Sequence, residues 1–313
     1  MKILILGAGG VGGYFGGRLA QAGADVTFLV RPKRAAQIQA DGLQIEAGGE
    51  TQRIPVQTVT ADTVKPIYDL VLLTPKSFDL DSALEAIAPA LHEDTCILPF
   101  LNGYAHLAKL DARYGQARVL GGVAYISAVL SPAGVIRKLG QPHALTFGPR
   151  TPAQTPIAQA LLALCHAAAF DTFYSDDIAQ ALWDKWVFLA TLAAGTTLYR
   201  GSIGEILNTA YGEMALRALY AECLGVAQHA GFAVGLESQA RHLKVILEQG
   251  SNFTASMLRD LLADQATEHE HILGELIQLA QSYQLATPYL HAAYGHLQVQ
   301  AMQRAAGLAN SRT

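Results

Sequence analysis

The fold is decided by the stretch Ile3-Leu4-Ile5-Leu6-Gly7-Ala8-Gly9-Gly10-Val11-Gly12. Its first four residues form a continuous apolar run, which is typical of a strand buried on both faces of a parallel sheet. The next six fit the Gly-x-Gly-x-x-Gly dinucleotide pattern. A helical segment, closed by Gly23, and a second apolar strand over residues 25–30 follow. We therefore predict a strand–helix–strand unit in which a dinucleotide is held by Gly7, Ala8, Gly9, Gly10, Val11 and Gly12.

Each glycine of this pattern has a physical task. The first permits a tight turn, the second lets the backbone approach a pyrophosphate, and the third lets the helix pack closely on the sheet. The pattern alone is weak, so a glycine-rich loop without a ligand stays as the plain alternative. Its place between a strand and a helix is what favours the dinucleotide.

The residue that ends the second strand indicates the cofactor. NAD sites usually carry an acidic residue there, which holds the ribose 2′-hydroxyl. This chain has Arg31 instead, followed by Lys33 and Arg34. A guanidinium pairs well with a 2′-phosphate, so we predict NADP rather than NAD. A solvated basic cluster is the alternative reading of the same residues.

Composition excludes several classes of protein. The 313 residues are 51% hydrophobic and 15% charged, with a net charge of −4, so neither a disordered chain nor a nucleic-acid or membrane-surface binder is expected. Three well-separated cysteines (Cys96, Cys165 and Cys223) form no Cys-x-x-Cys pair, and we expect free thiols and no metal site. The first strand leaves no room for a signal peptide, and no apolar stretch is long enough to span a bilayer. We expect a cytoplasmic protein.

The pattern of elements divides the chain into two domains. Up to residue 174, strands over residues 69–74, 95–100, 118–127 and 143–147 alternate with helices or hairpins, which favours a doubly wound parallel sheet of the α/β class. From residue 178 onward only helical periodicity appears, over residues 210–230, 238–248, 266–282 and 287–305. The prediction is a nucleotide domain over residues 1–174 and an all-helical substrate domain over residues 175–313, with Ser311–Thr313 as a frayed tail.

Lys185 is the first candidate for chemistry in the helical part. Helical spacing places it on one apolar stripe with Ile178, Leu182, Leu189 and Leu192. An ammonium group in such a stripe loses hydration, which lowers its pKa towards the range useful to a general acid. The alternative is a lysine whose stem lies on apolar surface and whose charge stays in water.

Glu268 and Asn102 are the other two candidates. Glu268 lies four residues before Ile272 on a predicted helix, although an acid in a first helical turn is also favoured by the helix dipole alone. Asn102-Gly103 follows a strand at the carboxyl edge of the predicted sheet, where ligands of such folds bind, or it forms a simple turn.

Together these features resemble one known family, the ketopantoate reductases (2-dehydropantoate 2-reductases). The resemblance rests on the glycine pattern, Arg31, Thr74-Pro75-Lys76, Asn102-Gly103, Leu182-Trp183-x-Lys185, Ser256-Met257 and Glu268, in that order. It implies a Rossmann-type domain that binds NADPH through the glycine pattern and Arg31, with Lys76 and Asn102 near cofactor and substrate. It further implies that Lys185 protonates the ketone oxygen, that Glu268 hydrogen-bonds the new hydroxyl, and that Ser256 helps to bind the substrate carboxylate.

The chain also departs from that family. Asparagines that the family usually carries near its substrate are replaced here by Leu189, Ala193, Ile203 and Leu273. A lost hydrogen bond to a polar substrate changes discrimination by about 1–3 kcal/mol. The departures put ketopantoate itself in question and favour a more apolar 2-oxo acid or ketone.

Three hypotheses follow from the sequence. The first is NADPH-dependent reduction of ketopantoate to pantoate, a step of pantothenate biosynthesis, and the second keeps this chemistry with a different oxo acid. The third is a non-catalytic protein that senses NADP, against which Lys185 and Glu268 argue because a sensor needs neither. Apolar helices in the second domain are compatible with a homodimer.

Overall fold

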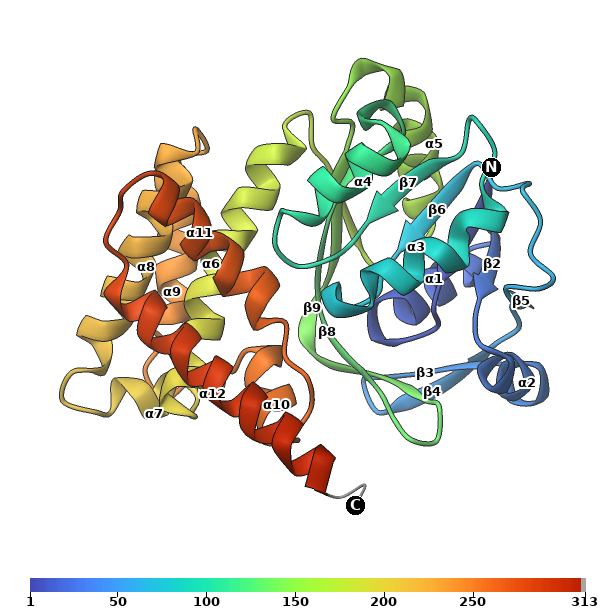
Figure 1. Cartoon of the computed structure of the whole chain (residues 1–313). Coiled ribbons are helices and arrows are strands. Elements are labelled where there is room, and N and C mark those ends of the chain that lie inside the picture. The colour runs from blue at the N-terminus through green and yellow to red at the C-terminus, as the bar shows by residue number, and fades with distance from the viewer. Residues whose placement is uncertain (311–313) are drawn as a thin grey trace. The chain divides into compact units, whose positions relative to one another are not determined.

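The computed structural model describes residues 1–310, and the chain forms two compact units (Figure 1). The first unit consists of Met1–Leu101 and His106–Ala181, and the second of Asn102–Ala105 together with the chain from Leu182 onward. The chain therefore passes between the units three times, because four residues after the last parallel strand join the helical unit. The predicted tail, Ser311–Thr313, lies outside the described residues.

The first unit contains the predicted parallel sheet. Its five strands lie in the order β5-β2-β1-β6-β7. Since β5 is third and β6 fourth among these strands along the chain, the order reverses between β1 and β6, the place where doubly wound sheets bind ligands. The strands are β1 (Lys2–Leu6), β2 (Asp25–Leu29), β5 (Gln57–Val59), β6 (Leu70–Leu73) and β7 (Cys96–Pro99). The associated helices are α1 (Gly10–Gln21), α2 (Pro32–Asp41), α3 (Leu80–Ile87) and α4 (His106–Tyr114).

A second sheet of mixed direction completes the unit. Its order is β10-β9-β3-β4, with β8 paired antiparallel to β9. The strands are β3 (Leu43–Ala47), β4 (Glu50–Ile54), β8 (Gly121–Leu130), β9 (Ile136–Gly148) and β10 (Asp171–Tyr174), and α5 (Thr155–Cys165) precedes β10. The strands expected over residues 118–127 and 143–147 thus form a long hairpin in this second sheet and do not extend the parallel one.

Helix α1 packs against both sheets, which explains its unusual glycine content. A Cβ atom at Gly16 would lie 2.7 Å from the Phe28 ring of the parallel sheet, and one at Gly17 would lie 2.7 Å from Ile45 of the second sheet. Gly16 thus faces the parallel sheet and Gly17 faces the second sheet, and each sheet lies too close to α1 for a side chain at that position. The glycines after the nucleotide pattern therefore serve packing between two sheets.

The second unit is helical, as predicted. Its core is built from residues such as Val187, Leu216, Leu219 and Leu276, all fully buried or nearly so. The helices are α6 (Ile178–Tyr199, which begins in the first unit), α7 (Ile203–Leu207), α8 (Gly212–His229), α9 (Leu236–Ile246), α10 (Ser256–Leu262), α11 (Glu275–Ser282) and α12 (Pro288–Asn310). A π-helical segment, Glu270–Gly274, leads into α11.

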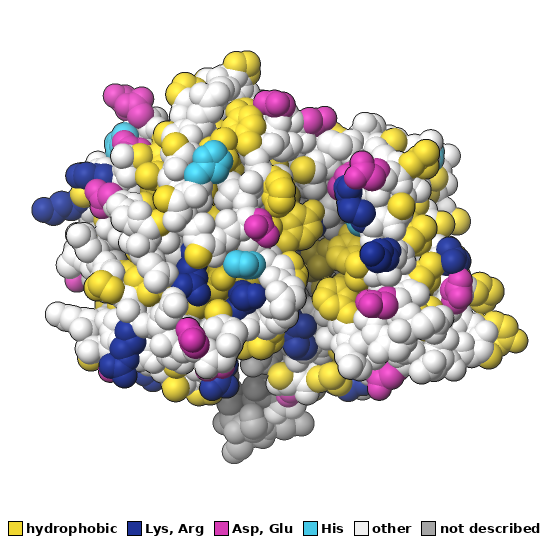
Figure 2. All heavy atoms as spheres, turned by 180° about the vertical axis from the view of Figure 1, so that it is seen from behind, with side chains coloured by type: hydrophobic (Ala, Val, Ile, Leu, Met, Phe, Trp, Pro, Cys, Tyr) yellow, Lys and Arg dark blue, Asp and Glu magenta, His cyan; other side chains and the backbone are white. Residues whose placement is uncertain are grey.

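The charged side chains on the surface are mixed in sign, which agrees with the small net charge of −4. On the face shown in Figure 2, Lys and Arg side chains are interspersed with Asp and Glu. Over residues 1–310, no helix is long and apolar enough to cross a membrane.

Candidate functional site

A pocket of about 680 Å³ lies in the first unit at the carboxyl ends of the parallel strands. Gly7, Ala8 and Gly9 line it, together with Thr74 and Pro75 after β6. Gly7 has a φ of +87°, a backbone conformation that favours glycine, so the chain can turn sharply out of β1. The size of the pocket and its glycine-rich floor fit part of a dinucleotide lying against the N-terminus of α1.

The other half of the glycine pattern serves packing. Gly10 and Val11 are the first residues of α1, and neither they nor Gly12 line the pocket. A Cβ atom at Gly10 would lie 2.5 Å from the carbonyl oxygen of Ala128 on β8, and one at Gly12 would lie 2.8 Å from the carbonyl oxygen of Gly7. A side chain at Gly10 would thus push the helix away from β8, and one at Gly12 would push it away from the loop that lines the pocket.

Two arginines lie at the far side of the pocket. Arg31 is exposed at the N-cap position of α2 and lines the pocket. Arg34 also lines it, but its guanidinium is engaged, donating to the carbonyl oxygens of Ala8 at 3.2 Å and Gly134 at 2.8 Å. Arg31 therefore has its charge available for a ligand phosphate, while Arg34 ties the glycine loop to the β8–β9 hairpin.

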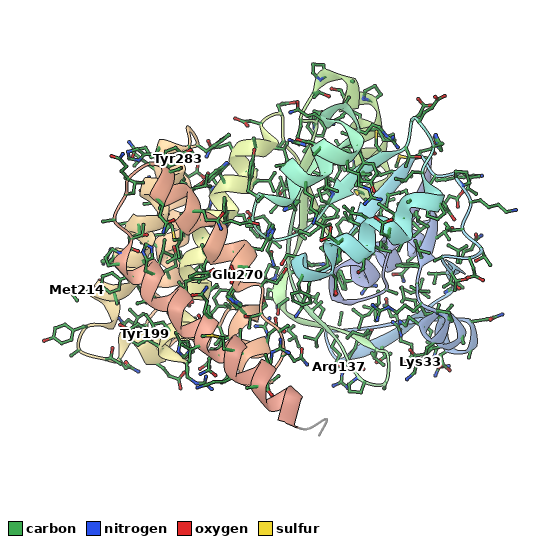
Figure 3. The ribbon with its side chains drawn as sticks, viewed as in Figure 1. Lys33, Arg137, Tyr199, Met214, Glu270 and Tyr283 are labelled. Carbon is green, nitrogen blue, oxygen red and sulfur yellow. The ribbon has the colours of Figure 1, made fainter. Side chains whose placement is uncertain are left out.

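Lys33 and Lys76 have different surroundings. Lys33 is exposed on α2 and does not line the pocket (Figure 3). The Lys76 ammonium lies 5.8 Å from the centroid of the Phe78 ring, and Lys76 is likewise absent from the lining, although its neighbour Pro75 is part of it.

Lys185 and Asn102 come together in the second unit. The Lys185 Nζ donates to Oδ1 of Asn102 over 3.1 Å. Asn102 reaches this position because the loop after β7 turns at Gly103, whose φ is +79°. The structure thus joins two predicted residues that are far apart in sequence and gives the ammonium a fixed direction.

The surroundings of Lys185 tune its acidity. Burial lowers the pKa of Lys185 to about 8, and the negative charge of Glu268 acts in the opposite direction, raising it. With a pKa near 8, Lys185 is largely protonated at neutral pH and releases its proton far more readily than an exposed lysine. This is the property that a general acid requires.

Glu268 lies just before a helix and not inside one. The predicted helix over residues 266–282 begins only at His269, and its first turns are π-helical over Glu270–Gly274. The expected apolar stripe from Glu268 to Ile272 and Leu276 is therefore offset by the wider π turn. Such segments are rare and occur often at functional sites.

Two side chains that the sequence did not single out support this arrangement. The buried Trp186 indole donates through Nε1 to the carbonyl oxygen of Ile272 over 3.0 Å, inside the π-helical segment. The His271 ring lies 3.0 Å from the position of a Cβ atom at Gly103, and its Nδ1 hydrogen-bonds Glu275 at 2.7 Å. An Asn-Gly pair is typical of a turn with a positive φ, but the buried histidine beside Gly103 could not be foreseen from it.

The neighbouring acid Glu270 faces elsewhere. Glu270 is labelled in Figure 3. Its carboxylate accepts a hydrogen bond from the hydroxyl of Tyr294 on α12 at 2.5 Å, and it lies 3.3 Å from Nε2 of His269. Glu268 and Glu270 therefore have different partners although they are two residues apart.

The remaining positions considered in the sequence analysis differ in how exposed their side chains are. Ser256 is exposed at the first position of α10. Ala193, Ile203 and Leu273 are fully buried in the helical core, whereas Leu189 is only partly buried. Of the four apolar replacements, Leu189 is thus the one with a surface that a ligand can reach.

Comparisons with known proteins agree with these observations. The family profile described as ketopantoate reductase PanE/ApbA matches residues 3–152, and the profile of the ketopantoate reductase PanE/ApbA C-terminal region matches residues 177–301. An uncharacterised oxidoreductase of Bacillus subtilis, YkpB, is 34% identical over 96% of this chain and 98% of its own. The 2-dehydropantoate 2-reductase of Aquifex aeolicus is 27% identical over 92% of this chain and 93% of its own.

Solved structures share the fold. A ternary structure of D-mandelate dehydrogenase with NADH and anilino(oxo)acetate superposes with a TM-score of 0.87 over 97% of this chain and 99% of its own. At 23% sequence identity this likeness concerns the fold alone.

Proposed function

The chain belongs to the ketopantoate reductase family of oxidoreductases, and from this membership we propose that it reduces 2-dehydropantoate to pantoate with NADPH. The observation that carries the proposal is the ammonium of Lys185, directed by Asn102 and placed in the field of Glu268. A reductase of ketones needs an acid at this point, because the carbonyl oxygen gains negative charge when a hydride reaches the carbon.

The roles of the residues follow from their chemistry. Lys185 stabilises the developing negative charge and transfers its Nζ proton to the oxygen. Asn102 holds the ammonium in one direction, which reduces the entropy lost on reaching the transition state. Glu268 keeps Lys185 protonated at neutral pH and accepts a hydrogen bond from the new hydroxyl, while the exposed hydroxyl of Ser256 hydrogen-bonds the substrate carboxylate.

The proposed cofactor, NADPH, would be bound by residues of the first unit. NADPH would supply the hydride, and Gly7, Ala8 and Gly9 would hold its pyrophosphate. Arg31 would bind the 2′-phosphate beside the N-terminus of α2, where backbone amides also favour an anion. Lys76 follows Pro75, which lines the pocket. The long, flexible side chain of Lys76 would reach a phosphate in the pocket by a change of rotamer.

A second candidate function keeps the reaction and changes the substrate. Leu189 follows Lys185 by one helical turn on α6 and is partly buried. A leucine there accepts an apolar group but leaves a polar group unpaired. A 2-oxo acid with a larger apolar side chain is therefore the alternative substrate.

The test is NADPH oxidation by the purified protein with ketopantoate and with a panel of 2-oxo acids of increasing apolar size. Selective turnover of ketopantoate supports the first candidate, and preference for a bulkier acid supports the second. Lys185→Ala should lower kcat by about 10²- to 10⁴-fold. Lys244→Ala, on the surface of α9, is the control and should leave kcat unchanged. NADPH binding without turnover of any oxo acid would favour the non-catalytic sensor and overturn both.

Two further points belong to this proposal. The three cysteines are free thiols, in keeping with a cytoplasmic location. A homodimer is proposed from exposed apolar side chains of the helical unit such as Met214 and Met302, and sedimentation of the purified protein tests it.

A further inference from the structure

A second pocket in the first unit has no part in the proposed reaction. Its volume is about 590 Å³, and it lies between Tyr14 and Arg18 of α1, the β3–β4 turn and β9. The nucleotide pocket is lined from the other end of α1, by the loop that precedes Gly10. The two pockets share no lining residue.

An irregularity in β9 builds one wall of this pocket. Opposite β8, the pairing of Ile126 with His143 is followed directly by the pairing of Ser127 with Leu139, so residues 140–142 bulge out of the ladder. Gly140 permits the bulge with a φ of +69°. The Lys138 ammonium donates to the carbonyl oxygens of Gly140 at 2.6 Å and Gln141 at 3.3 Å, which holds the bulge and the positive charge together at the pocket. Bulges of this kind often redirect side chains at functional sites.

A buried arginine forms the floor. Arg18 is only 8% exposed, and its guanidinium carbon lies 5.3 Å from the centroid of the Tyr14 ring. Its Nη1 donates to the neutral amides of Gln21 at 2.8 Å and Gln52 at 2.5 Å. Its Nε is buried without a hydrogen-bond partner, and across residues 1–310 no carboxylate forms an ion pair with Arg18. A buried guanidinium with only neutral partners is costly unless an anion compensates it.

The remaining lining adds positive potential and no acidic side chain. Besides Arg18 and Lys138, its polar side chains are those of Tyr14, Gln52, Gln141 and His143. His143 hydrogen-bonds the Tyr14 hydroxyl through Nδ1 at 2.9 Å. Burial lowers the pKa of His143, the charges of Lys138 and Arg18 lower it further, and Asp171, exposed on β10, acts in the opposite direction. The positive charges of Lys138 and Arg18 thus both act on the His143 ring.

We propose that this pocket is a second ligand site, which binds a small metabolite through a carboxylate or phosphate group held by Arg18 and Lys138. Arg18 suits an oxyanion because its positive charge has only neutral hydrogen-bond partners, and Lys138 adds a second, compact positive charge from β9. The tyrosine, glutamine and histidine of the lining supply further polar contacts. The site is separate from the reaction, so the proposal stands whichever oxo acid is the substrate.

The test is calorimetric titration of the full chain with inorganic phosphate and, separately, with succinate. NADPH is present at saturation, so that the nucleotide pocket is filled. We expect one ligand to bind, with at least tenfold weaker affinity in Arg18→Gln and severalfold weaker affinity in Lys138→Gln. Binding by phosphate alone or succinate alone distinguishes the two kinds of anion.

Controls keep the result interpretable. Arg137→Gln removes a charge of the same sign from the residue before Lys138 on β9. Because Arg137 is exposed and pairs with Glu46, this substitution should leave the affinity unchanged. If Arg18→Gln fails to fold, Lys138→Gln decides the matter, because Lys138 is only half-buried and does not belong to the hydrophobic core. Absence of binding by both anions, or equal affinity in Lys138→Gln and Arg137→Gln, would overturn the proposal.

Discussion

At the scale of single residues, the acidity of Lys185 sets the pH dependence of the reaction. With a pKa of about 8, Lys185 carries its proton below pH 8 and loses it above. We expect kcat for reduction to be constant below this pH and to fall about tenfold per pH unit above it. In contrast, kcat for oxidation of the hydroxy acid should rise about tenfold per pH unit up to this pH and be constant above it. Steady-state rates in both directions check this, and parallel profiles in the two directions would contradict it.

The charge of Glu268 should shift that profile. Glu268 raises the pKa of Lys185, so Glu268→Gln should move the falling limb for reduction to lower pH and reduce kcat by about 10²-fold. Glu270→Gln is the matched control, because Glu270 is exposed and engages His269 and Tyr294. A pH profile shifted equally by both substitutions would rule out a specific role of Glu268.

Arg31 should decide between the two nicotinamide cofactors. Arg31→Ala removes a charge-assisted contact with the 2′-phosphate, so KM for NADPH should rise about 10- to 100-fold while KM for NADH stays the same. Lys33→Ala removes a charge two residues away, outside the pocket, and should change neither. Equal KM values for NADPH in the two variants would remove Arg31 from the proposed site.

At the scale of elements, the loop after β7 should be sensitive to a single methyl group. Gly103 and Gly115 have nearly the same φ, +79° and +80°, but a Cβ atom at Gly103 would meet His271 at 3.0 Å, whereas nothing lies within 4 Å of one at Gly115. Gly115→Ala therefore measures the backbone cost alone, about 1 kcal/mol. Gly103→Ala should lose more stability in denaturant unfolding and also lower kcat, since it displaces Asn102. If the two substitutions lowered the free energy of unfolding equally, the contact with His271 would have no effect on stability.

The elements also show what the sequence could predict. The parallel strands and long helices were predictable, because buried apolar runs and 3.6-residue periodicity mark them directly. The short strands β5 and β10 and the helices α4, α5, α7 and α10 were missed. The pairing of β9 with both β3 and β10 joins segments too distant for any local pattern. Within the site, the sequence indicated Lys185, Asn102 and Glu268, but the π-helical turn and His271 depend on tertiary packing that no periodicity reveals.

At the scale of the whole molecule, the three chain crossings between the units should couple their unfolding. Both tryptophans, Trp183 and Trp186, belong to the helical unit, whereas the nucleotide pocket belongs to the other. Saturating NADPH, at about 100 times its Kd, adds about 2.7 kcal/mol to the stability of the unit that binds it. We expect the tryptophan-monitored unfolding midpoint to rise with NADPH. If NADPH does not change the midpoint of the unsubstituted protein, the two units unfold independently. Arg31→Ala is the control, because its weaker binding of NADPH should reduce the shift.

The short loop Asn102–Ala105 has a consequence for recombination between relatives. It brings the side chain of Asn102 to Lys185 and stacks Tyr104 on Trp186, with ring planes 8° apart and centroids 6.4 Å apart, although both loop residues are encoded within the first third of the gene. A chimera joined at residue 174 or 181 would exchange the helices and keep a foreign loop among them. Swaps of substrate specificity within this family should therefore transplant two separate segments at once, the long helical one and these four residues.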